Sequence, residues 1–73
     1  MSFKISDRPF TKELYFKIRR DTPLRRAFNV FCQGQSVNKE RVIFELGEDV
    51  IDPESTAAQI GLTEKDTIIC REV

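Results

Sequence analysis

The 73-residue sequence predicts an α+β fold, a mixed sheet wrapped round one main helix in the order ββαββαβ. Two observations lead to this prediction. Two runs near the start alternate apolar and polar residues, as strands with one buried face do. A later segment, 24–32, instead spaces its apolar residues three and four apart, as a helix does. The chain is about half as long as a typical domain, so we expect a single domain, residues 1–73, with one modest core.

The first two strands are predicted from this alternation. Phe3 and Ile5 alternate with polar neighbours, which predicts a strand over residues 2–6. The same pattern predicts a second strand over residues 13–19. Asp7-Arg8-Pro9 supplies turn chemistry between the two, and so short a connection favours an antiparallel hairpin.

A helix follows the hairpin. Thr22 is a suitable N-cap, and Pro23 suits the first helical position because it loses no hydrogen bond there. The apolar stripe of this helix consists of Leu24, Ala27, Phe28, Phe31 and Cys32. Gly34 comes just after the stripe, so we expect the helix to end there.

The second half of the chain predicts three more strands and a short helix. Residues 41–46 alternate and are closed by a turn at 47–49, and a short strand is expected at Val50-Ile51. Ser55 or Thr56 caps a helical turn over 57–60, which Gly61 ends. A β-rich run from Thr67 to Arg71 predicts the last strand.

Composition excludes several classes of function. The sequence contains no histidine, and its only cysteines, Cys32 and Cys70, form no CxxC pair. Ordinary zinc sites and Ser-His or Cys-His catalytic pairs are therefore absent, and no glycine-rich phosphate-binding motif occurs. We expect no enzymatic activity, cofactor or metal, and two reduced, packed cysteines. With no signal-peptide core and no long apolar run, we expect a cytosolic or nuclear protein.

Charge is unevenly distributed along this neutral chain. Residues 1–37 hold eight Lys or Arg against three Asp or Glu, a net +5, whereas residues 38–73 hold four against nine, a net −5. This asymmetry predicts two faces of opposite potential, each able to attract a different partner. The alternative is that the two halves interleave in space and the charges average out.

A hairpin, a crossover helix and further strands describe the β-grasp arrangement of ubiquitin-like proteins. Within that arrangement, four segments resemble the corresponding elements of SUMO modifiers. They are Tyr15-Phe16-Lys17-Ile18-Arg19, Phe31-Cys32-Gln33, Ile60-Gly61-Leu62 and Asp66-Thr67-Ile68. The pattern of that family can be followed without a gap from Phe3 to Glu72. No single short motif is diagnostic, but the continuous register is specific.

SUMO modifiers end in a flexible Gly-Gly tail through which they are conjugated, whereas this sequence stops at Val73. We therefore expect a domain that is not conjugated. It resembles the SUMO-like domains built into larger proteins, in particular the C-terminal one of the RENi genome-maintenance family. That resemblance implies a nuclear location and a role in DNA repair. The alternative is a SUMO modifier trimmed of its tail.

The resemblance implies a binding site for the SUMO-conjugating enzyme. In SUMO, an acidic residue and a glycine after the third strand, with an aspartate entering the last strand, dock on this enzyme non-covalently. The matching positions here are Gly47, Glu48 and Asp66, with Asp49 adjacent. Glycine and acid occur in reversed order, which displaces the carboxylate by one residue. The alternative is that these acids are merely solvated.

The resemblance also implies a groove between the second strand and the helix that accepts a short hydrophobic and acidic peptide as an added strand. The residues expected to line it are Phe16, Lys17, Ile18, Arg19, Arg26 and Phe31. Ala27 and Gly34 stand where the family usually has leucine and arginine, so we expect weak peptide binding. The alternative is that the aromatic and aliphatic members belong to the core.

The sequence thus predicts a monomeric interaction domain that binds the SUMO-conjugating enzyme as an adaptor or regulator of the SUMO pathway. One rival is a self-assembling scaffold in which the basic face of one copy meets the acidic face of the next. Nucleic-acid binding is disfavoured because the acidic half opposes phosphate contacts by the arginines of the basic half.

Overall fold

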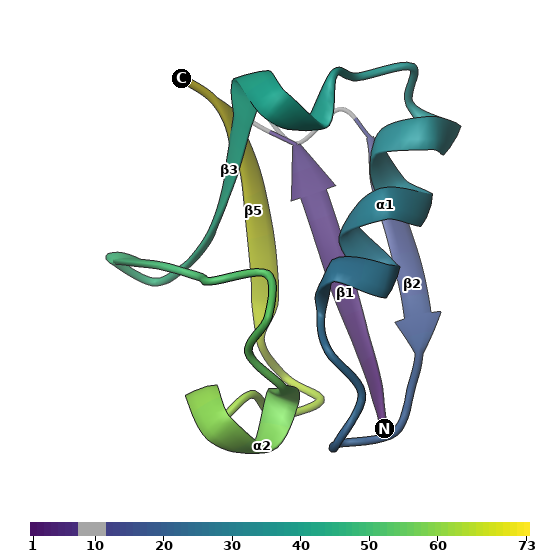
Figure 1. Ribbon diagram of the computed structural model, residues 1–73. Coiled ribbons are helices and arrows are strands. Elements are labelled where there is room, and N and C mark those ends of the chain that lie inside the picture. The colour runs from purple at the N-terminus through teal and green to yellow at the C-terminus, as the bar shows by residue number, and fades with distance from the viewer. Residues whose placement is uncertain (8–11) are drawn as a thin grey trace.

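The computed structural model describes residues 1–7 and 12–73. Five strands form one mixed sheet in the order β2-β1-β5-β3-β4, with the main helix α1 against one face (Figure 1). The strands are β1 Ser2–Asp7, β2 Glu13–Lys17, β3 Val42–Leu46, β4 Asp49–Val50 and β5 Thr67–Glu72. The helices are α1 Arg25–Gly34, the 3₁₀ turn η1 Lys39–Arg41 and α2 Ala57–Ile60. The predicted fold class and element order are confirmed, and η1 is an addition.

The sheet mixes parallel and antiparallel pairs. β1 is antiparallel to β2 and parallel to β5, while β3 is antiparallel to both β5 and β4. The predicted hairpin of β1 and β2 is confirmed, although Arg8 and Pro9 of its expected turn lie outside the described residues. β2 ends at Lys17, earlier than expected. Ile18 still donates to the Met1 carbonyl at 2.9 Å and accepts from the Met1 ammonium at 2.7 Å.

The start of α1 differs from the prediction. Thr22 does not cap it: the N-cap residue is Leu24, and no side chain makes a capping hydrogen bond. Instead the backbone N–H of Leu24 donates to the Ser55 carbonyl at 2.9 Å, and that of Arg25 donates to the Pro53 carbonyl at 2.8 Å. Free N–H groups at a helix start need such acceptors, and here a distant loop supplies them. The helix therefore begins at Arg25, after the predicted Pro23.

The end of α1 also differs slightly. Gly34 is the last helical residue rather than the terminator, and Ser36 adopts the left-handed conformation, with φ +55°. A Cβ added at Gly34 would lie 3.7 Å from Cδ1 of Leu14 in β2. The small residue thus lies at the point where the helix approaches this strand.

The core lies between α1 and the sheet. Its buried residues include the whole predicted helical stripe, Leu24, Ala27, Phe28, Phe31 and Cys32, together with Phe3, Ile5, Val42, Phe44, Ile51, Ala57, Leu62, Ile68 and Cys70. The rings of Phe28 and Phe44 stack with centroids 3.9 Å apart, and Phe31 meets Phe44 edge-on at 6.2 Å. Neither α-helix among the described residues has the length and apolar character needed to cross a membrane.

Both cysteines are free and buried in this core. Burial raises the pKa of the Cys70 thiol to about 11, with a smaller contribution from Cys32 and nearby carboxylates. Burial likewise raises the pKa of Cys32, partly opposed by Lys39. Neutral thiols are poor nucleophiles, so these side chains serve as packing groups.

The short helix α2 begins and ends as predicted. Thr56 caps it: the Gln59 N–H donates to Thr56 Oγ1 at 3.2 Å, and the Thr56 N–H donates to Gln59 Oε1 at 2.9 Å. This reciprocal pair is a capping box. Gly61 ends the helix in the left-handed conformation, with φ +70°.

Candidate partner-binding surfaces

The predicted acidic site begins in the hairpin turn between β3 and β4. Leu46 pairs with Asp49, so Gly47 and Glu48 are the two central residues of the turn. Gly47 has a φ of +64°, and among the described residues only Ser36 and glycines have positive φ. Positive φ at the first central position alone is the type II′ arrangement, which favours glycine there. This explains why glycine precedes the acid and places Glu48 at the hairpin tip.

Glu48 and Asp49 are accessible to a partner. Both residues are exposed, as is Gly47. Figure 1 shows the turn after β3 extending away from the body of the sheet. Within the described part of the chain, no hydrogen bond or ion pair engages either carboxylate. No contact with residues 1–7 or 12–73 therefore neutralises their negative charge.

Asp66, the third predicted acid, has a structural role of its own. It is half-buried, and its Oδ2 accepts a hydrogen bond from the Thr63 N–H at 2.9 Å. The Asp66 N–H in turn donates to the Thr63 carbonyl at 3.1 Å. These bonds close the turn that leads into β5, so one carboxylate oxygen of Asp66 is already occupied.

The two acidic turns lie at the same end of the β3–β5 pair. Glu45 of β3 is level with Ile69 of β5, where this ladder stops. The β3–β4 turn leaves the sheet beyond Glu45, while Asp66 directly precedes β5. Both acidic turns therefore adjoin the same end of the β3–β5 ladder.

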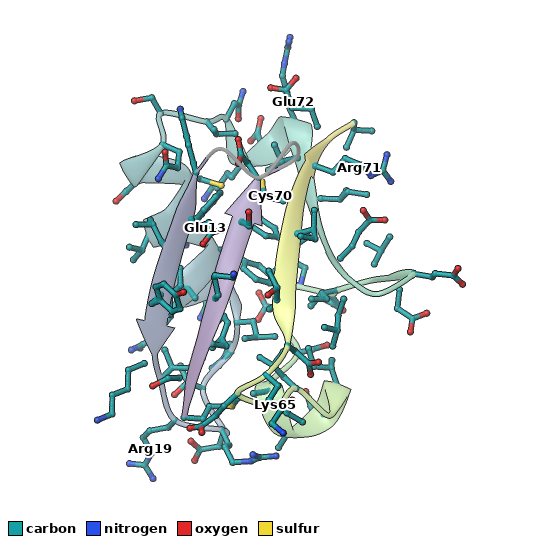
Figure 2. All side chains as sticks on the ribbon, turned by 180° about the vertical axis from the view of Figure 1, so that it is seen from behind. Glu13, Arg19, Lys65, Cys70, Arg71 and Glu72 are labelled. Atoms are coloured by element: carbon teal, nitrogen blue, oxygen red, sulfur yellow. The ribbon has the colours of Figure 1, made fainter. Side chains whose placement is uncertain are left out.

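Another acid of β3 is engaged within the sheet. Arg71 donates from Nε to Glu45 Oε1 at 2.9 Å and from a terminal nitrogen to Glu45 Oε2 at 3.3 Å. Figure 2 shows Arg71 on β5 in the view from behind the sheet. Because Arg71 occupies both oxygens of Glu45, the exposed acids of this region are those of the turn.

The predicted peptide groove borders β2, which is an edge strand. Among the described strands, β2 pairs only with β1. The hydrogen-bonded pairs Met1–Ile18 and Asp7–Lys12 fix the alternation of this ladder. In an antiparallel ladder, hydrogen-bonded and non-hydrogen-bonded pairs alternate. The backbone N–H and C=O groups of Glu13, Tyr15 and Lys17 therefore point away from β1, towards solvent. This edge can accept an added strand.

The structure separates the six residues predicted to line this groove. Phe16 and Ile18 are half-buried, at the margin of the core that faces α1. Lys17 falls on the opposite face of β2, because successive side chains alternate. Phe31 is 0% exposed and packs in the core, so it presents no surface to a peptide. The prediction that Phe31 lines the groove is therefore wrong for this structure.

Two predicted cations lie near the groove. Arg26 is exposed on α1, and Arg19 is exposed just after β2, with its Nε 3.4 Å from Asp21 Oδ1. The prediction missed Val30, which is 56% exposed on the flank of α1 nearest β2. Its position three residues after buried Ala27, at the margin of the apolar stripe, is the sequence signal that marks it.

The outer face of the sheet, away from α1, is largely polar at β1 and β2. The Lys4 ammonium lies 3.4 Å from Glu13 Oε2 and 6.0 Å from the centre of the Tyr15 ring. Tyr15 is 75% exposed, and Glu13 is labelled on this side in Figure 2. Exposed pairs of this kind stabilise a fold little.

Residues 8–70 match the protein family described as "Ubiquitin-2 like Rad60 SUMO-like". The chain belongs to this family. Over 53 residues it is 36% identical to Small ubiquitin-related modifier 4 of Sus scrofa and 32% identical to Small ubiquitin-related modifier 2 of Homo sapiens. Each match covers 73% of this chain and 56% of the relative, so the aligned region spans little more than half of each relative.

The fold of this Rad60 SUMO-like domain is shared with solved ubiquitin-like structures. A designed protein based on human erythrocytic ubiquitin superposes with a TM-score of 0.80 at 17% identity, covering 99% of this chain and 90% of the design. The N-terminal ubiquitin-like domain of the 4931431F19Rik protein gives 0.75 at 11% identity, covering 96% and 71%. These likenesses confirm the β-grasp fold. The finer resemblance to the RENi C-terminal domain stays a prediction.

Proposed function

We propose that this Rad60 SUMO-like domain binds the SUMO-conjugating enzyme non-covalently through Gly47, Glu48, Asp49 and Asp66. In this proposal it is an adaptor or regulator of the SUMO pathway, not itself conjugated, in the nucleus and in DNA repair. The observation that carries the proposal is the exposure of two carboxylates, which have no partner among the described residues, in a projecting type II′ hairpin.

The four residues have different roles. Glu48 and Asp49 supply charge that attracts a cationic surface and steers the encounter. Gly47 holds the turn that presents them, because its positive φ strains residues with a side chain. Asp66 holds the neighbouring turn through Thr63, and its second oxygen adds to the negative potential. The affinity should fall with added salt, since rim charges are screened over about 8 Å at physiological ionic strength.

The test is Glu48→Arg, titrated against the SUMO-conjugating enzyme by calorimetry. Glu72→Arg is the matched control, because it makes the same charge change at the opposite end of β5 from Asp66. We expect Glu48→Arg to weaken binding about tenfold or more, about 1.4 kcal/mol, and Glu72→Arg to change it little. Both variants should unfold within about 0.5 kcal/mol of the parent, because both side chains are exposed. Equal losses from both variants, or none from Glu48→Arg, would refute the site.

The β2 edge supports a second, weaker function, the binding of a short hydrophobic and acidic peptide. The supporting observation is the row of outward backbone groups at Glu13, Tyr15 and Lys17 beside half-buried Phe16 and Ile18. In NMR titrations with such a peptide, the amides of the outward residues should shift more than those of their even-numbered neighbours. Uniform small shifts along β2 would contradict strand addition.

A further inference from the structure

The two edges of the sheet carry opposite charge. β2 forms one edge and β4 the other, at opposite ends of the strand order. The exposed cations Lys17, Arg19 and Arg26 lie on or beside the β2 edge. The exposed acids at this edge are Glu13, which is 3.4 Å from the Lys4 ammonium, and Asp21, which is 3.4 Å from Arg19. The exposed acids Glu48, Asp49 and Asp52 lie on or beside the β4 edge, and the exposed cations Arg25 and Lys39 line the groove next to it, Arg25 at 3.6 Å from Glu54. The domain therefore has a basic edge and an acidic edge facing in opposite directions.

Each edge also has backbone groups without a strand partner. Glu13, Tyr15 and Lys17 direct theirs away from β1, as described above. On the other edge, Ile51 N–H donates to the Phe44 carbonyl at 2.8 Å, which makes Phe44–Ile51 a hydrogen-bonded pair. Because the two kinds of pair alternate, the neighbouring pair Glu45–Val50 is a non-hydrogen-bonded pair. The N–H and C=O of Val50 therefore point away from β3.

Apolar surface is exposed at both edges. Val50 on β4 is 60% exposed and Val30, beside the β2 edge, is 56% exposed. Val30 faces that edge because Gly34, one turn further along α1, approaches Leu14 of β2. Val50 lines a groove of about 750 Å³ between α1 and β3, whose walls include Phe28, Phe44 and Ile51. An apolar side chain approaching the β4 edge can therefore be buried there.

We propose that this chain pairs head to tail with a second copy, the β2 edge of one molecule extending the sheet at the β4 edge of the next. Charge, backbone groups and exposed valines are complementary between these edges. Because the two edges differ, the contact is heterologous and leaves a free edge at each end, so an open chain forms. The pairing is weak because β4 has only two residues, and dilute protein is monomeric.

The proposed pairing goes beyond binding of the SUMO-conjugating enzyme but shares Glu48 and Asp49 with it. A molecule whose β4 edge is covered by a second copy has no accessible acidic turn. Pairing therefore reduces the number of enzyme-binding sites as protein concentration rises.

The test uses two edge variants and sedimentation equilibrium at low salt. Tyr15→Pro removes an outward N–H from β2, and Val50→Pro removes one from β4; proline is tolerated at such edge positions. The average mass of the parent should rise with concentration up to the millimolar range and fall with salt. Each variant alone should have the mass of a monomer at every concentration, since one of its two edges is blocked. An equimolar mixture should form dimers and nothing larger, because each variant retains the edge that the other lacks.

A charge swap covers the case in which a proline variant does not fold. Lys17→Glu or Asp49→Lys alone should abolish pairing, and the two together in one chain should restore it. The proposal is overturned by a parent that stays monomeric at every concentration, by a mixture that does not pair, or by dimers of a single-edge variant. None of these results involves the conjugating enzyme, so they do not bear on the proposed function.

Discussion

Phe31→Ala should lower the free energy of unfolding more than any exposed substitution on the same helix. Phe31 is 0% exposed and its ring meets that of Phe44 edge-on, with centroids 6.2 Å apart. Truncating a buried Phe to Ala typically costs about 3 to 5 kcal/mol, which includes the lost aromatic contact. At about 0.05 to 0.15 kcal/mol per residue, a domain of this length has a total stability of about 4 to 11 kcal/mol. The variant should therefore lose between about a quarter and all of the stability of the domain.

Urea unfolding followed by far-ultraviolet circular dichroism measures this loss. Val30→Ala, one residue earlier and 56% exposed, is the matched control and should change stability by less than about 1 kcal/mol. The result also separates the two interpretations of Phe31. A groove residue would weaken peptide binding at nearly unchanged stability, whereas a core residue destabilises the fold. A loss below about 1 kcal/mol for Phe31→Ala would refute its assignment to the core.

Two further predictions concern the capping box and the buried thiols. Thr56→Ala removes the acceptor of the Gln59 N–H and should lower the free energy of unfolding in urea by about 1 kcal/mol. Thr56→Ser keeps a hydroxyl acceptor and should retain most of that free energy. Equal free energies of unfolding for the two variants would contradict the cap. The Cys70 thiol has a pKa of about 11 in the folded protein, against an ordinary value of 9.0. As the pH rises, the thiol of the unfolded chain therefore loses its proton first, and the free energy of unfolding should fall between pH 9 and pH 11. The fall from this thiol is at most about 2 to 3 kcal/mol, and Cys70→Val should flatten it; an unchanged profile would contradict the shift.

The sequence predicts the strands well because their alternation reports which face is buried. β1 and β3 follow from Phe3, Ile5, Val42 and Phe44, all of which lie in the core. The capping box of α2 is equally local, since both partners lie within four residues. Local patterns of this kind depend only on neighbours in the chain, so a sequence contains them in full.

The start of α1 could not be predicted in the same way. Thr22-Pro23 is a reasonable local signal, but the N–H groups of Leu24 and Arg25 have better-placed acceptors in the carbonyls of a loop about thirty residues later. A tertiary contact thus replaces a side-chain cap. The fate of Phe31 has a similar cause: the helical period places it on the buried stripe, and the resemblance placed it at the groove. The structure supports the periodic interpretation.

The predicted acidic site shows both what a sequence contains and what it lacks. The residues that form the turn can be predicted from the sequence. Once the pairing of Leu46 with Asp49 is known, the positive φ of Gly47 fixes the turn type. The hydrogen bond from the Thr63 N–H to Asp66 could not be predicted from the sequence, because it depends on the path of the chain into β5. One carboxylate oxygen of Asp66 is therefore engaged within the domain, whereas Glu48 is the position at which substitution tests binding most directly.

Whether charge is separated in space depends on topology, which composition does not determine. The basic half of the chain contributes β1, β2 and α1, and the acidic half contributes β3, β4 and β5. In the order β2-β1-β5-β3-β4, the described strands of the two halves are neighbours only at the β1–β5 pair (Figure 1). Had one strand of the second half been inserted between β1 and β2, the charges would have mixed. The order found keeps the strands of the two halves on opposite sides of the β1–β5 pair, and the proposed head-to-tail pairing rests on this separation.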